Sequence, residues 1–348
     1  MLFKRSPSPH IKQNISVQDM MYKVVYAMIP GALAAMYFFG WGVLFNLIIA
    51  ITTCLVTEAV MLRMRKREVL TSLQDGSAFV TACLLALALP SLAPWWITFI
   101  ASLFAIAVAK HLYGGLGFNP FNPAMVGYIV VMISFPLEMT MWSAPMGVNG
   151  GWPDFITTFN WVFLGVLPVA ETIDSISMAT PIDLLKTQLS QYHDIHETRN
   201  SEQYSALFST ISGTGWQWVN IAFLAGGIWL VRKGVADWRI PTAFLISLIL
   251  ISNLFAVIDY SSNSSALFHA FSGGTMLCAF FIATDPVSAS TTPKGRWIYG
   301  ACIGALVYVI RSWGGYPDGI AFAVVLMNIA APLIDYYTQP KVFGDPNK

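Results

Sequence analysis

Residues 43–62 read VLFNLIIAITTCLVTEAVML, twenty residues with a single charged side chain, Glu58. A run of this length and composition is long enough to cross the hydrocarbon core of a bilayer as a helix. The whole chain has the same character, because 56% of its 348 residues are hydrophobic and only 11% are charged, against about 25% charged residues in soluble domains. The sequence therefore predicts an all-α polytopic membrane protein.

Nine further apolar runs make ten expected membrane helices. Several of them are short or are interrupted by Pro and Gly, and such breaks persist in a bilayer only where protein or a cavity satisfies the freed backbone groups. Residues 90–94, PSLAP, are expected to form a tight turn between the third and fourth helices. The ten expected spans are 20–39, 43–62, 77–94, 95–112, 121–141, 215–231, 240–258, 266–284, 297–311 and 319–337.

The two halves of the chain show a weak internal repeat. Residues 77–90 align with residues 273–286, since each begins with small residues, continues as an apolar run and closes with a proline. Residues 113–115 likewise align with residues 313–315. Each half has five expected spans, an odd number, so the second copy is expected to enter the membrane from the opposite side. Inverted repeats of this kind tend to place a site or pathway at the midplane between the halves.

The distribution of basic residues predicts the orientation. With a cytoplasmic N-terminus, sixteen of the nineteen Lys and Arg residues fall on the cytoplasmic side, as expected from the excess of basic residues in cytoplasmic loops. The expected divisions are a cytoplasmic tail at 1–19, a first five-helix repeat at 20–141, an outside loop at 142–214, a second repeat at 215–337 and a cytoplasmic tail at 338–348.

The outside loop contains the stretch DSISMATP at residues 174–181. Thr180, Pro181 and Asp183 predict a helix start, with Thr180 as the N-cap and Pro181 in the first turn. The role of a helix cap is by itself a complete explanation of residues 180–183. A phosphate esterified to the Thr180 hydroxyl would also be favoured here, because free amides and the helix dipole at a helix N-terminus attract anions.

Two other polar stretches adjoin the expected spans and are candidate walls of a cofactor or ion site. Residues 114–124, GGLGFNPFNPA, precede the fifth span, and a tight helix junction is the alternative interpretation. Residues 284–292, TDPVSASTT, follow the eighth span, and they could equally satisfy broken helix ends. The candidate residues in these stretches are Asn119, Asn122, Asp285 and Thr292.

Glu58 is the acid deepest in an expected span. Acids inside a membrane are functional by default, so ion transfer is one interpretation, and snorkelling toward the basic residues 63–67 is the other. Asp318 is expected to cap the tenth helix. No catalytic residue is expected. No metal site is expected either, since the four cysteines stand singly in apolar runs. They are Cys54, Cys83, Cys278 and Cys302.

Several longer strings resemble the NqrB/RnfD family. Its members are the RnfD (RsxD) subunits of bacterial Rnf ion-translocating electron-transport complexes and, more distantly, the NqrB subunits of the sodium-pumping NADH:quinone reductase. The resemblance covers essentially the whole chain. It rests on FFGWG (38–42), YGGLG (113–117), NPFNPAM (119–125), GWQWVN (215–220), TDPVSASTT (284–292) and GGYPDG (314–319).

The resemblance implies a bacterial inner-membrane subunit that carries FMN through a phosphoester bond to a threonine. A flavin transferase would install the FMN at a motif of the form Asp-x-x-(Ser/Thr)-x-Ala-Thr, which maps here onto Asp174, Ser177, Ala179 and Thr180. Met178 replaces a position that is often glycine in such motifs.

The resemblance also implies partners and a mechanism. The partners are iron–sulfur subunits and a second flavin-bearing subunit, which exchange electrons between NADH and ferredoxin while H⁺ or Na⁺ crosses the membrane. A second, non-covalent flavin such as riboflavin is implied near residues 119–122 or 284–292. Membrane lipid is a further expected partner and nucleic acid is not. The main alternative is a solute channel or carrier of urea-channel-like architecture, and a third is a scaffold that leaves Thr180 unmodified.

Overall fold

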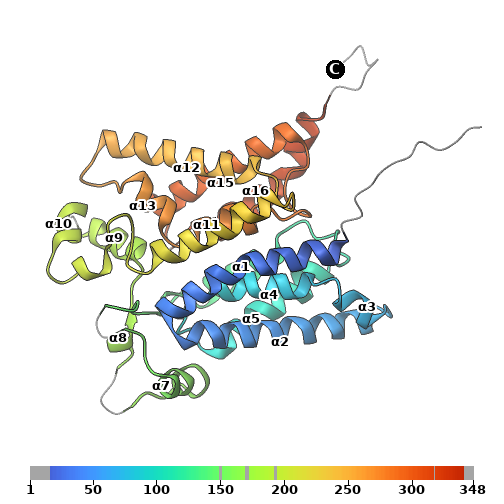
Figure 1. The fold of residues 1–348 in the computed structure, drawn as a ribbon, viewed down its shortest axis with the longest axis horizontal. Coiled ribbons are helices and arrows are strands. Elements are labelled where there is room, and N and C mark those ends of the chain that lie inside the picture. Colours follow the sequence, from blue (N-terminus) through green and yellow to red (C-terminus); the bar gives the residue numbers. More distant parts are fainter. Residues whose placement is uncertain (1–15, 149–150, 169–171, 192–193, 317, 341–348) are drawn as a thin grey trace, which may run out of the picture.

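The computed structural model describes residues 16–148, 151–168, 172–191, 194–316 and 318–340. Two groups of helices lie against each other along their length, and a connecting segment lies at one end of both (Figure 1). We call residues 17–134 the first half, residues 216–337 the second half and residues 135–215 the connecting segment.

The first half begins with two long helices, followed by a short turn of helix and three further helical segments. Ser16 caps the first helix by accepting a hydrogen bond from the Asp19 amide, and Gly40, at φ 79°, separates it from the second. The segments are α1 (Val17–Phe39), α2 (Trp41–Met64), α3 (Val69–Leu73), α4 (Ser77–Ala88), α5 (Trp95–Leu103) continuing into the π-helix η1 (Phe104–His111), and α6 (Pro123–Ser134).

The second half has a similar order of long and broken helices. Its segments are α11 (Trp216–Arg232), α12 (Arg239–Ile258), α13 (Ala266–Phe271), α14 (Thr275–Leu277) continuing into the π-helix η5 (Cys278–Ile282), α15 (Pro293–Trp313) and α16 (Ile320–Tyr337). In the described part of the chain, α1, α2, α12 and α16 are long and apolar enough to cross a membrane. The chain is therefore an all-α membrane protein, as the composition predicted.

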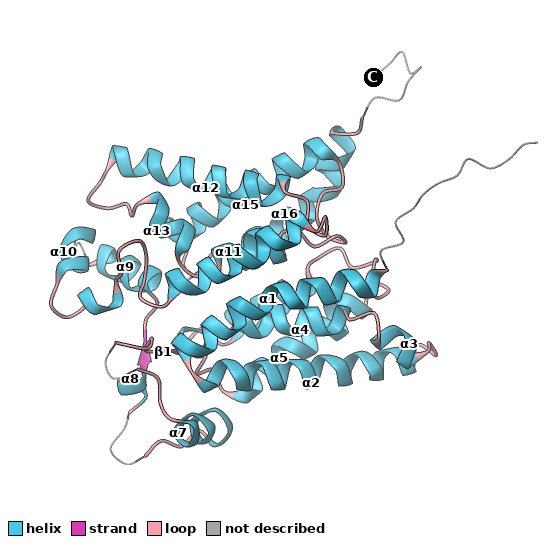
Figure 2. Ribbon diagram, in the orientation of Figure 1, coloured by secondary structure: helices cyan, strands magenta, loops and turns pink. Residues whose placement is uncertain are grey.

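The connecting segment holds short helices and a two-stranded ladder (Figure 2). Strand β1 (Trp142–Ser143) pairs antiparallel with β2 (Ser177–Met178). The helical segments are η2 (Glu138–Thr140), α7 (Phe155–Phe159) continuing into η3 (Asn160–Leu164), α8 (Ile173–Ile176), α9 (Pro181–Ser190), α10 (Ile195–Asn200) and η4 (Ser205–Leu207).

Three of the expected spans differ from the observed helices. The third ends at Ala88 rather than residue 94, and the predicted turn follows, with the Ala93 amide bonded to the Pro90 carbonyl at 3.2 Å. The fifth ends at Ser134 rather than residue 141, because Pro136 disfavours the helical conformation of the residue before it.

The third difference is the eighth span, which is broken into α13 and α14 at residues 272–274. Gly273 has φ +54°, and a Cβ there would lie 2.5 Å from an Asp318 carboxylate oxygen. The break therefore depends on glycine both for its backbone conformation and for the approach of Asp318.

The halves meet where α1 packs on α11 and α6 packs on α16, and one large core cluster draws on both halves. The α1–α11 contact is close because it uses glycine. A Cβ on Gly226 would lie 1.9 Å from the Ala27 carbonyl oxygen, and a Cβ on Gly31 would lie 2.2 Å from the Phe223 ring. Small residues let membrane helices approach closely enough for backbone contact.

Gly226→Leu is therefore expected to force α1 away from α11. Overpacking of this kind costs about 1–3 kcal/mol of folding free energy, and thermal unfolding of the detergent-purified chain measures it. Ala225→Leu is the matched control, because Ala225, the neighbouring residue of the same helix, is exposed and surface changes usually stay within about 0.5 kcal/mol. Equal melting temperatures for the two variants would show that the helices do not meet at Gly226.

Candidate functional site

Thr180 stands at the start of α9, directly after strand β2. Its backbone is extended, and its hydroxyl oxygen accepts a hydrogen bond from the Asp183 amide at 3.3 Å. Pro181 occupies the first helical position, where a missing N–H costs nothing. The cap predicted from the sequence is confirmed.

The rest of the 174–181 stretch is held by the ladder. Residues 177–178 pair with Trp142 and Ser143, which follow the first half along the chain. The ladder therefore ties the stretch to one end of the first half. Ala179 is exposed. Asp174 belongs to α8, and its side chain lies outside the described residues.

Thr180 lines a cavity whose walls come from both halves and from the connecting segment. We call it the Thr180 cavity. Its walls are mostly apolar and rich in aromatic rings, with the ring centroids of Trp142 and Trp216 4.7 Å apart. Tyr128 and Phe223 add two further rings. A ligand attached at Thr180 would therefore meet a mostly apolar enclosure that includes four aromatic rings.

A partly buried ion pair adjoins this cavity on the side of the second half. Asp318 lines the cavity, and its carboxylate accepts hydrogen bonds from Arg311 Nε at 2.9 Å and Nη2 at 3.1 Å. The same guanidinium donates to the His269 carbonyl and the Thr275 hydroxyl, on either side of the break between α13 and α14. Arg311 thus joins the broken segment to the start of α16.

Sequence reasoning found only part of this pair. The N-cap of α16 is Gly319 rather than Asp318, but the Asp318 carboxylate, one residue earlier, accepts from the Ile320 amide at 3.3 Å. Charge counting places Arg311 merely among the basic residues on the outside, yet it is 2% exposed. The available signal was a lone arginine near the end of an apolar run, seven residues before an acid.

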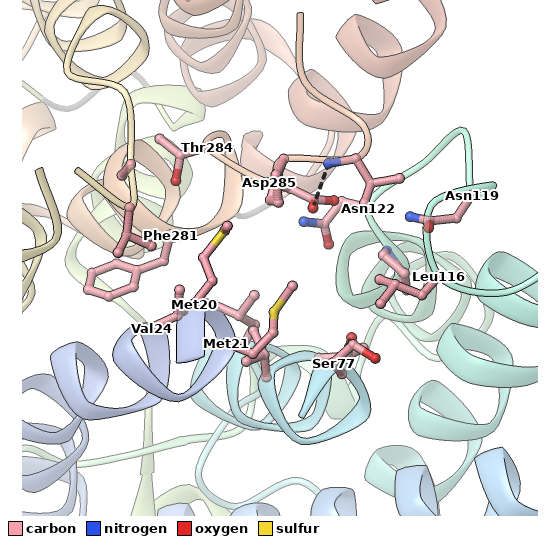
Figure 3. Close-up of a pocket in the computed structure, with 18 of the residues that line it drawn as sticks. Met20, Met21, Val24, Ser77, Leu116, Asn119, Asn122, Phe281, Thr284 and Asp285 are labelled. Atoms are coloured by element: carbon pink, nitrogen blue, oxygen red, sulfur yellow. Dashed lines mark hydrogen bonds between the residues drawn. The ribbon is translucent and has the colours of Figure 1, made fainter. Parts of the chain in front are cut away.

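A second cavity also lies between the halves, and we call it the Asn122 cavity (Figure 3). It is lined by Asn119 and Asn122 from the first half and by Asp285 from the second. The structure therefore brings together two stretches more than 160 residues apart in the sequence.

The two asparagines of this cavity have different surroundings. Asn122 caps α6, with its side-chain oxygen accepting from the Met125 amide at 3.2 Å, and its own backbone amide donates to Asn328 of α16 at 2.9 Å. Asn119 is 4% exposed, and its Oδ1 is buried with no hydrogen-bond partner in the described part of the chain. Because buried polar atoms are nearly always partnered, this oxygen is a candidate acceptor for a bound molecule.

Asp285 is held in a turn that follows η5. Its carboxylate accepts from the Ser288 hydroxyl at 2.7 Å. It also accepts from the Val287 amide at 3.2 Å, and this second bond is the one dashed in Figure 3. Burial raises the pKa of the Asp285 carboxyl, and these hydrogen bonds oppose the shift.

Thr292 lies in other surroundings. Its hydroxyl caps α15 by accepting from the Gly295 amide at 3.0 Å, and its amide donates to Asp335 of α16. The Asp335 carboxylate also accepts from the hydroxyls of Ser290 and Thr291. Thr292 is thus part of a junction between α15 and α16, in line with the alternative that this stretch satisfies helix ends.

Glu58 forms a buried ion pair that sequence reasoning missed. Both of its carboxylate oxygens lie 2.6 Å from Lys110 Nζ, which also donates to the Ser77 hydroxyl at 2.7 Å. The two charged side chains are only 2% and 3% exposed. The interpretation that Glu58 snorkels toward residues 63–67 is therefore wrong. Lys110, which charge counting placed on the cytoplasmic side, is buried and lines the Asn122 cavity.

The described residues include no group of three or more His, Cys, Asp and Glu side chains that could hold a metal ion. The four cysteines are free thiols, three of them buried and Cys302 partly so. The functional candidates are therefore the two cavities and their polar residues.

Comparison with known proteins agrees with the strings noted in the sequence. A model of the NQR2, RnfD, RnfE family matches residues 4–344. The chain belongs to this family. Similar relatives include proteins from Vibrio cholerae, Vibrio atlanticus and Salmonella paratyphi A, each named as the D-type subunit of an ion-translocating oxidoreductase complex.

These relatives match the chain from end to end. The Vibrio cholerae protein is 48% identical and the Vibrio atlanticus protein 49% identical, and each alignment covers 99% of this chain and 100% of the relative. The Salmonella protein is 47% identical, with 99% of each chain covered. Membership of the NQR2, RnfD, RnfE family confirms the resemblance seen in the sequence.

Proposed function

We propose that this chain is a membrane subunit of an ion-translocating oxidoreductase complex and carries FMN in phosphoester linkage on Thr180. The observation that carries the proposal is the position of Thr180, a helix cap that also lines an aromatic cavity between the two halves. Family membership and the names of the relatives support the complex. The residue pattern at 174–180 supports the attachment.

The residues around Thr180 fit both parts of FMN. The N-terminus of α9 favours a phosphate. Burial raises the pKa of the Asp183 carboxyl, with nearby Lys186 acting in the opposite direction. Aromatic and methionine walls suit a flat, largely apolar ring system. FMN, when bound, supplies electron transfer, while this chain's residues hold and orient it and exclude water.

A second, non-covalent flavin such as riboflavin fits the Asn122 cavity in our proposal. The support is the unpartnered Asn119 Oδ1, which would accept from a ring N–H. Asn122 and Asp285 add polar groups to an otherwise apolar enclosure. Denaturing the purified chain should release one free flavin in addition to any that stays attached, and an absence of released flavin would contradict this assignment.

The proposal includes ten membrane spans arranged as two inverted five-helix repeats. It is supported by the contacts of α1 with α11 and α6 with α16, and by the corresponding packing of α2 on α5 and α12 on α15. The charge distribution supports a bacterial inner-membrane location with both termini cytoplasmic and residues 142–214 periplasmic.

The proposed partners are iron–sulfur subunits and a second flavin-bearing subunit, with a flavin transferase acting during maturation. In this arrangement the chain relays electrons between ferredoxin or NADH and the other carriers, coupled to translocation of H⁺ or Na⁺. The competing function is a solute channel or carrier of urea-channel-like architecture. The observation that favours it is that both cavities lie between the halves, where such a conduit would run.

Membrane vesicles that contain the assembled complex separate the two functions. We expect NADH to reduce the flavin attached to this chain, which is identified as the flavin that remains bound after denaturation. NADH should also drive ion uptake into these vesicles, and vesicles prepared without this chain should show no such uptake. Proteoliposomes of the chain should show no urea flux above protein-free liposomes. Rapid urea flux without any attached flavin would instead establish the channel.

A further inference from the structure

An open groove runs between α2 and the continuous α5–η1 helix. One wall is the stretch of α2 from Thr52 to Met61, and the other is formed by Phe99, Leu103 and Ala107. The α2 wall is open to the outside, because Val56 is 63% exposed and Val60 is 51% exposed.

The groove offers little for a polar ligand to bind. Its lining is aliphatic and aromatic apart from three threonines. The most exposed of them, Thr52, donates its hydroxyl to the Ile48 carbonyl at 2.8 Å, so the donor is already used within its own helix. An exposed apolar groove along a membrane helix suits an acyl chain.

A basic cluster formed by Arg63, Arg65, Lys66 and Arg67 lies at one end of this groove. Met61, the last groove residue on α2, is one helical turn from Arg65, or about 6 Å along the axis. Lys66 turns the chain with φ 55° at the end of α2. The cluster therefore begins where the apolar wall stops.

The basic cluster covers the ends of both helices that form the groove. The guanidinium of Arg65 donates to the His111 carbonyl at 3.4 Å, at the end of η1, and Arg67 donates to the Gly114 carbonyl at 3.5 Å. Within the ranges that the structure describes, none of these four cations takes part in an ion pair. Their positive charge is available to an anion.

We propose that the groove and the basic cluster together bind one anionic phospholipid, with an acyl chain along α2 and the phosphate at Arg63, Arg65 and Arg67. Basic clusters next to membrane helices attract anionic lipid head groups. A free phosphate would use only the cluster, and a helix of a partner subunit would use only the groove. The lipid accounts for both features and for their continuity.

The test is lipid titration of the full chain followed by native mass spectrometry. Phosphatidylglycerol and phosphatidylethanolamine with the same acyl chains differ in net charge, and we expect phosphatidylglycerol to bind at least tenfold more tightly. Glycerophosphoglycerol, the same head group without acyl chains, should not compete. Equal affinity for the two lipids, or full competition by the head group alone, would overturn the proposal.

Two kinds of variant test the two parts of the site. Arg65→Gln with Arg67→Gln should weaken phosphatidylglycerol binding by about fivefold for each charge removed. Ala107→Leu should weaken it by filling the groove without changing the charge. Val60→Trp fills the groove from the other wall and serves if Ala107→Leu does not fold.

The matched control is Arg232→Gln with Lys233→Gln, which removes two charges at the end of α11 and should leave binding within twofold. An equal loss in this control would mean non-specific charge attraction. In the assembled complex, a photoactivatable phosphatidylglycerol should label Val60→Cys. If that cysteine instead cross-links to another subunit and not to the lipid, the groove belongs to a partner helix and the lipid site is contradicted.

Discussion

Thr180→Ala is expected to remove all covalently attached flavin from this chain. The phosphoester needs the threonine oxygen, and alanine supplies none. In-gel fluorescence of the denatured chain, made with the flavin transferase present, measures the attached flavin directly. The wild-type band should fluoresce and the alanine band should not.

Alanine also removes the N-cap of α9, which typically costs about 1 kcal/mol, so a second variant must separate the two effects. Thr180→Asp keeps an excellent cap residue but offers no hydroxyl for esterification. It should be as stable as the wild type and carry no flavin. Thr187→Ala, an exposed threonine within the same helix, should keep full fluorescence. Fluorescent Thr180→Asp protein would mean that the flavin is attached elsewhere.

Removing one partner of the Glu58–Lys110 pair is expected to have the largest effect on stability. Glu58→Gln leaves the Lys110 ammonium as an uncompensated charge in a buried site, and such changes cost about 3–5 kcal/mol. Lys110→Met leaves the Glu58 carboxylate with only the His111 ring, whose Nε2 lies 3.6 Å away. Glu58→Gln and Lys110→Met should therefore each lower the yield and the melting temperature of the detergent-purified chain. The double variant should recover most of the loss, because no buried charge remains.

The control is the partly exposed network in which Asp237 pairs with Arg239 and Arg296. Asp237→Asn should cost less than about 1 kcal/mol, since exposed ion pairs contribute little. If Glu58→Gln melts like Asp237→Asn, then water or another charge reaches Glu58 in solution. If the double variant is no more stable than the single ones, the pair is not the reason for their loss.

The sequence predicted the long helices and the local turns well, because these depend on nearby residues. The apolar runs at 20–39 and 43–62 are the cores of α1 and α2, and the helix cap at Thr180 follows from short-range chemistry. The sequence analysis missed the break in the eighth span, because residues 266–284 form one continuous apolar run in the hydropathy pattern. The break depends on Gly273 meeting Asp318, more than forty residues later.

In the candidate sites, too, the sequence predicted features that depend on nearby residues and missed contacts between distant ones. The sequence identified Asn119, Asn122 and Asp285 separately, but only the contact between the halves brings them to one cavity. Charge counting treated Lys110 as a solvent-facing residue, because no local signal shows that its side chain meets Glu58. Long-range pairing decides which polar residues of a membrane helix are buried, and a single sequence does not contain that pairing.

Mass spectrometry of the Thr180 peptide is the most direct test of the proposed function. Cleavage after Glu171 and Glu197 yields residues 172–197, which contain Thr172, Thr180 and Thr187. We expect this peptide, taken from membranes with the assembled complex, to be heavier by one FMN less one water, with fragmentation placing the addition on Thr180. An unmodified peptide from membranes in which the complex is active would contradict the account.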